Sequence, residues 1–326
     1  MAAAEAPARD GLPDTKTLLE RERRERPRAA AAAVAAALLG LAAWIIPQWI
    51  YDDYPRVPFL TALQDAAGTR PEGSVGLAVP RLEFLDDNAM ALLGVSILQG
   101  LSTLALGYVL VVLYTAVRDR GATIPRVSHM LAMLGAVAGA VGTIGFQIAV
   151  NVKVADYVDS GEHTSAAARE ALRSDFIVGM TGVAQIGLLV LAVAVILISL
   201  NAMRAGLLTR FLGVLGIIVG VLMVLFGPAG FGAPPFLLQA FWLLAVALLL
   251  TGRGPSGLTP AWQSGEAVPW PSQLELAEQR ARAQEERRKQ RERGGQAEAD
   301  ASEDGEDCGA AGGRRSPYPR PGCSRP

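Results

Sequence analysis

Six long runs of apolar residues constrain this chain more than any other feature of its sequence. Their cores contain no Lys, Arg, Asp or Glu, and the shortest core, 211–226, is extended at both ends to reach the length of a span. About 20 helical residues cross the roughly 30 Å hydrocarbon core of a bilayer. The sequence therefore predicts an all-α integral membrane protein with six transmembrane helices, over residues 29–50, 89–117, 127–152, 176–203, 207–227 and 235–251.

The basic residues predict how the chain is threaded. With six crossings, 24 of the 30 Lys and Arg residues fall on the side that carries both termini. The short loops 118–126 and 204–210 contribute five of them, and short loops report orientation best because an excess of Lys and Arg stays in the cytoplasm. Both termini are therefore expected to be cytoplasmic.

The segments between and beyond the spans differ in composition. We expect a charged cytoplasmic segment over 1–28, an acidic outer loop over 52–88, a juxtamembrane segment with a charged helix over 252–293, and a disordered tail over 294–326. Within the third of these, 272–293 is the expected contact for anionic lipids or a cytoplasmic protein. The net charge of −1 gives no case for nucleic-acid binding.

Metal and cofactor sites are not expected. The two cysteines, Cys308 and Cys323, both lie in the polar tail, which excludes a cysteine-ligated metal centre in the spans. One outer loop holds a group of potential cation ligands, but it lacks the spacing of an EF-hand and is interpreted as a solvated loop. The members of that group are Asp156, Asp159, Glu162 and His163.

The apolar cores of the spans contain no acidic or basic residue apart from His129, near one end of the third span. Proton-coupled pumps, voltage sensors and intramembrane proteases need buried acids, bases or metal ligands. The sequence offers no catalytic constellation, so the chain is not expected to be an enzyme. What the spans do contain is a set of neutral amides, for which two roles are open: lining a cavity or bonding between helices. These amides are Gln99, Gln147, Gln185 and Gln239.

Two pairs of glycines at GxxxG spacing predict close helix packing. The pairs are Gly135 with Gly139 and Gly216 with Gly220, and packing within one chain is favoured over a homo-oligomer interface. The pairs align at an offset of 81 residues, and Gln99 aligns with Gln185 at an offset of 86. Spans two and three are therefore a possible parallel repeat of spans four and five.

Three stretches carry a resemblance to a known family. They are 201–220, the pair Phe241-Trp242, and 262–272, which contains Gly-Glu-Ala-Val-Pro-Trp-Pro. Together they resemble uncharacterised multi-pass integral membrane proteins of actinobacteria that carry a domain of unknown function, over about 23–288. The resemblance implies a bacterial plasma-membrane protein and no activity, substrate or catalytic residue.

Three functions follow from these observations, in order of preference. The first is a non-enzymatic membrane protein with an organising, sensory or accessory role. The second is a carrier or channel for a neutral or apolar small solute, based on the amides at matching depth. The third is a membrane enzyme that uses the outer loops and His163, for which the sequence shows no complete set of catalytic groups.

Overall fold

The fold is described from a computed structural model. It describes residues 15–54, 79–160, 173–226, 234–254, 257–270, 277–278 and 280–290. The chain divides into two compact units, Met1–Trp270 and Pro271–Pro326. In the second unit, 280–290 are helical and exposed, with an ion pair from Lys289 Nζ to Glu285 Oε1 at 2.8 Å. The tail predicted over 294–326 lies outside the described residues.

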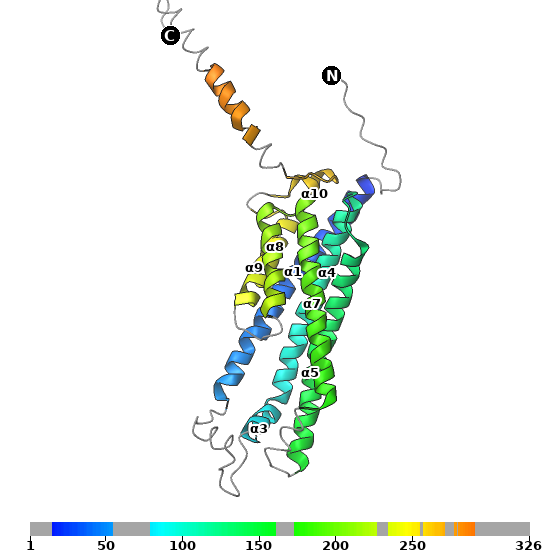
Figure 1. Cartoon of the computed structure of the whole chain (residues 1–326), viewed down its shortest axis with the longest axis vertical. Helices are drawn as coiled ribbons and strands as arrows, with labels where there is room; N and C mark the ends of the chain where they lie inside the picture. The colour runs from blue at the N-terminus through cyan, green and yellow to red at the C-terminus, as the bar shows by residue number, and fades with distance from the viewer. Residues whose placement is uncertain are drawn as a thin grey trace, which may run out of the picture. The chain divides into compact units, whose positions relative to one another are not determined.

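All elements of the described part are helices, which confirms the predicted all-α class (Figure 1). Four of them are long and apolar enough to cross a membrane: α1 (Thr15–Ile50), α4 (Ala89–Asp119), α5 (Arg126–Ser160) and α7 (Asp175–Arg204). Two apolar helices are shorter, α8 (Arg210–Phe226) and α9 (Pro234–Leu250). The remaining elements are the 3-10 turn η1 (Tyr51–Asp53) and the short helices α3 (Val79–Asp87) and α10 (Pro260–Ser264).

Several boundaries differ from the prediction. Helix α1 is continuous through Pro27, so the charged segment and the first span form one helix. The predicted loop 52–88 contains α3 near its end, and Asn88 separates α3 from α4. The fifth span was expected from residue 207, but α8 begins at Arg210, because Leu207 and Leu208 are fully buried in the turn that precedes it.

Helices α5 and α7 approach each other closely because both expose backbone at glycines. A Cβ added at Gly135 would lie 2.6 Å from the Leu191 backbone nitrogen, closer than van der Waals radii allow. A Cβ at Gly187 would collide with the backbone of Gly139. Such contacts gain van der Waals energy, which drives helix association where the hydrophobic effect is absent.

The second glycine pair also packs within the chain. A Cβ at Gly216 would lie 2.9 Å from the Ser199 Cβ of α7 and from the Trp242 Nε1 of α9, and one at Gly220 would meet α7 as well. Trp242 Nε1 donates to the Leu212 carbonyl at 3.0 Å, which ties α9 to α8. Both pairs thus pack against α7. Helix α5 has 35 residues whereas α8 has 17, so the corresponding helices of the suggested repeat differ in length.

Replacing Gly187 with alanine tests the close contact between α5 and α7. We expect Gly187→Ala to destabilise the protein by roughly 1–3 kcal/mol, because the added methyl group forces the two backbones apart. Thermal unfolding in detergent micelles measures the change. Gly182→Ala is the matched control on the same helix, since no atom lies within 4 Å of its added Cβ. Equal melting temperatures for the two variants would contradict the close approach.

Candidate functional site

A cavity of about 290 Å³ lies between α4, α5, α7, α8 and α9. It lies at the level where α8 ends at Phe226 and α9 begins near Phe236. Its wall is mainly apolar and contains no acidic, basic or cysteine side chain. The lining residues are Gln99, Thr103, Leu106, Gly139, Thr143, Ala184, Gln185, Leu188, Leu191, Met223, Phe226, Phe236 and Gln239.

Three side-chain amides converge on this cavity from three different helices. Gln99 comes from α4, Gln185 from α7 and Gln239 from α9. Within the described part of the chain, none of the three side chains makes a hydrogen bond, and Gln185 Oε1 is completely buried without a partner. An unpaired polar group in an apolar environment costs free energy, so this arrangement favours occupation by a group that bonds to amides.

The two hydroxyl groups of the cavity are already bonded. Thr103 Oγ1 donates to the Gln99 carbonyl at 2.9 Å, and Thr143 Oγ1 donates to the Gly139 carbonyl at 2.8 Å. The amide NH₂ groups are therefore the free side-chain donors of the cavity. Carboxamides both donate and accept, so the site suits an uncharged ligand that carries hydroxyl, carbonyl or amide groups.

The fourth predicted amide, Gln147, lies elsewhere. Its Nε2 donates to Asn151 Oδ1 at 2.8 Å, and Asn151 Nδ2 donates to the Ala89 carbonyl at 3.0 Å, which joins α5 to the start of α4. Gln147 therefore bonds within α5, to the residue that makes the contact with α4. The structure therefore brings together three of the four residues.

The cavity is closed on the side of the bundle where α4 and α7 end. There the facing side chains of these helices are completely buried and apolar. They include Leu110, Leu113, Val195 and Ile198. Beyond them, at the end of the first unit, lies a cap formed by residues 257–270, which include α10. We call this part of the molecule the capped end.

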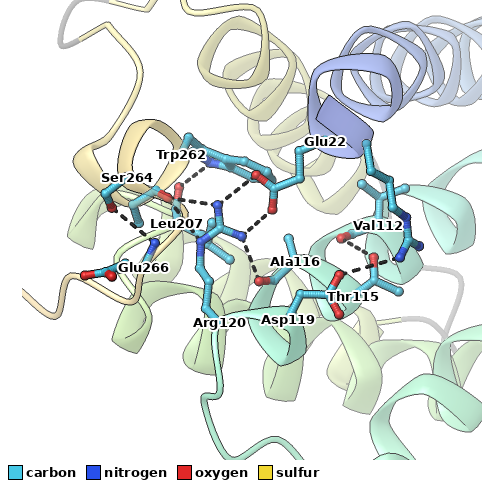
Figure 2. A network of polar contacts seen from close by, with 12 residues as sticks. Glu22, Val112, Thr115, Ala116, Asp119, Arg120, Leu207, Trp262, Ser264 and Glu266 are labelled. Carbon is cyan, nitrogen blue, oxygen red and sulfur yellow. Dashed lines mark hydrogen bonds and ion pairs between the residues drawn. The ribbon is translucent and has the colours of Figure 1, made fainter. Parts of the chain in front are cut away.

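A buried ion pair holds the capped end together (Figure 2). The Arg120 guanidinium at the end of α4 pairs with the Glu22 carboxylate of α1, with Nη2 to Oε2 at 2.9 Å. The same group donates to the Ala261 carbonyl from Nε and Nη2 and lies 4.9 Å from the centre of the Trp262 ring. The topology prediction counted Arg120 among the charges of the loop 118–126. The structure buries this side chain, and its fourth partner is the Ala116 carbonyl, to which Nη1 donates at 2.8 Å.

The cap also bonds to the turn between α7 and α8. Thr259 Oγ1 and Trp262 Nε1 both donate to the Leu207 carbonyl, and Trp270 Nε1 donates to the Leu208 carbonyl at 3.0 Å. These carbonyls follow the end of α7, where a helix leaves its last C=O groups without a partner. The sequence gives no local signal for these bonds, because each tryptophan and its partner are 55 or more residues apart.

Comparison with known proteins adds no relative, since no protein-family model, curated protein or solved structure matches this chain. The described residues hold no group of three or more metal-ligating side chains. Glu162 and His163 lie outside those residues.

Arg120→Gln tests the buried pair. We expect a loss of about 3–5 kcal/mol of stability, because the carboxylate of Glu22 would remain buried without its partner. Chemical denaturation in mixed micelles measures the loss. Arg21→Gln is the control, since Arg21 pairs with Glu25 at an exposed site and such pairs contribute about 0–1 kcal/mol. A similar small effect from both variants would contradict a stabilising role for the buried pair.

Proposed function

We propose that this chain is a six-span protein of the bacterial plasma membrane with both termini in the cytoplasm. The four long apolar helices support membrane insertion. Helices α8 and α9 contribute the remaining two spans of the proposal, each about 25 Å long at 1.5 Å per residue. The distribution of Lys and Arg supports the orientation, and the resemblance to actinobacterial membrane proteins supports the location.

We also propose that the protein binds an uncharged small molecule in the cavity. The observation that carries this proposal is the convergence of Gln99, Gln185 and Gln239 on an apolar cavity with their amides unpaired among the described residues. Its volume lies near the lower end of the roughly 300–1,000 Å³ range of small-molecule pockets. The lining offers no general base and no activated nucleophile, which favours binding over catalysis.

Two uses of such binding are compatible with the geometry. In the first, which we favour, occupancy of the cavity serves a sensory or organising role, because the capped end is closed and residues 257–270 connect it to the tail. In the second, the protein is a carrier for the neutral solute, and the Glu22–Arg120 pair and the cap would have to open in each cycle. Partners through 272–293, either anionic lipids or a cytoplasmic protein, belong to the first use, whereas no nucleic-acid partner is proposed. A homo-oligomer is compatible with both.

Cysteine accessibility tests the cavity. Single cysteines replace Gln99, Gln185 or Gln147 in a Cys308→Ser/Cys323→Ser background, and intact cells are treated with a small membrane-impermeant thiol reagent. We expect labelling at positions 99 and 185, which line the cavity, and protection at 147, whose side chain is buried outside the cavity. Protection at all three positions, with an exposed control cysteine at Asp53 labelled, would mean a dry bundle and would refute the proposed site.

The same reagent tests the threading. We expect Asp53→Cys to react in intact cells, whereas the native Cys308 and Cys323 react only after permeabilisation, because an even number of spans puts both termini inside. Mass spectrometry of labelled peptides reads out each position. Labelling of Cys308 in intact cells would contradict the proposed topology.

A further inference from the structure

A separate narrow crevice lies between the cavity and α1. It has a volume of about 10 Å³ and shares Gln99, Phe236 and Gln239 with the cavity. Its far wall is a face of small residues on α1 that includes Ala37 and Gly40. The three shared side chains therefore separate the cavity from the seam between α1 and α9.

The surroundings of this seam are suited to lipid chains. Leu237 and Phe241, on the first turns of α9, are exposed by about half, and Trp49 near the end of α1 is 75% exposed. Gly40 and Phe236, at the seam itself, are partly exposed. In a helix that crosses a bilayer, exposed apolar side chains face acyl chains, so a molecule that reaches the cavity along this seam comes from the membrane.

Two of the three amides, Gln99 and Gln185, lie nearer the outer side of the membrane than Leu106, whereas Gln239 lies at about the depth of Leu106. Gln99 and Gln185 each lie 18 residues, or about 27 Å of helix, from the predicted span ends at Val117 and Met203. Because both helices also continue ten residues beyond these amides, this depth lies in the outer half of the bilayer. Leu106 lies seven residues further into α4 than Gln99, near the middle of the bilayer. A lipid of the outer leaflet has the same order, with its head outside and its chain toward the middle.

We propose that the cavity takes an uncharged single-chain amphiphile from the outer leaflet, whose hydroxyl or amide head bonds to Gln99 and Gln185 and whose chain enters along the seam between α1 and α9 past Phe236. This inference rests on the proposed function and specifies the class of its ligand. The volume of the cavity excludes a whole two-chain lipid, and an anionic head is disfavoured because the lining has no basic residue to pair with it.

Photolabelling of the full chain in lipid nanodiscs tests the proposal. The probe is lauroylglycerol with a diazirine in its acyl chain, compared with the anionic lauroyl-lysophosphatidylglycerol that carries the same diazirine. We expect the neutral probe to label peptides that line the cavity or the crevice, and the anionic probe to label them much less. We expect Gln185→Leu to weaken labelling about fivefold, the effect of one lost hydrogen bond. Gln147→Leu, which removes an amide outside the cavity, should leave labelling unchanged.

Competition separates failure of this inference from failure of the proposed function. Unlabelled lauroylglycerol should block the probe, whereas free glycerol should not, because it lacks the chain. Equal labelling by the neutral and the anionic probe would refute an uncharged amphiphile as the ligand. So would equal inhibition of the labelling by glycerol and by lauroylglycerol. If glycerol also protects Gln99→Cys from thiol reagent, the proposed function holds with a water-borne ligand instead. If no probe labels the cavity and cysteines at 99 and 185 are unreactive, both proposals fail.

Discussion

The shortness of α8 and α9 is the constraint on which the cavity depends. Gln99 and Gln185 lie ten residues from the first residues of α4 and α7, so each long helix continues about 15 Å past the cavity. The short helices end at this level, with Phe226 and Phe236 at the cavity wall. Figure 1 shows α8 and α9 beside only part of the longer helices. Six helices pack together on one side of this level, and the four long helices continue beyond it.

Tight packing elsewhere makes the cavity stand out. Helices α5 and α7 touch through backbone at Gly135, Gly139 and Gly187, and the apolar side chains between the cavity and the capped end are fully buried. A bundle packed in this way does not leave a 290 Å³ cavity by general looseness. The amides at its wall also indicate that the cavity is occupied. An unpaired carboxamide in an apolar environment raises the free energy of the folded protein unless water or a ligand bonds to it.

Much of the fold follows from the sequence because the constraint is local. Length and the absence of charge identify each apolar run, and a membrane-spanning backbone has little choice but a helix. Gln99 and Gln185 lie at a similar distance along their predicted spans, and this position predicted that the two amides lie at the same depth in the membrane. No residue at a matching depth marked Gln239 in the same way, because its position at the cavity depends on where α9 begins. The continuous α1 was not predicted, because the change from charged to apolar residues after Arg28 marked the start of the span and says nothing about where the helix begins.

The buried ion pair of the capped end could not be predicted from the sequence, for a different reason. Glu22 and Arg120 each sit in a run of alternating charges, and no local pattern separates a buried pair from a solvated one. Their burial depends on Ala261 and Trp262, which follow more than 140 residues after Arg120 in the chain. Positive charges at loop ends indicate orientation, but they carry no information about which of them pairs inside the protein.

The most direct test of the account is an experimental structure of the full chain in nanodiscs made from the lipids of its own membrane. Our account predicts non-protein density in the cavity, in contact with the amides of Gln99, Gln185 and Gln239 and continuous with the seam between α1 and α9. An empty cavity in which the three glutamines bond to one another or to neighbouring helices would contradict it.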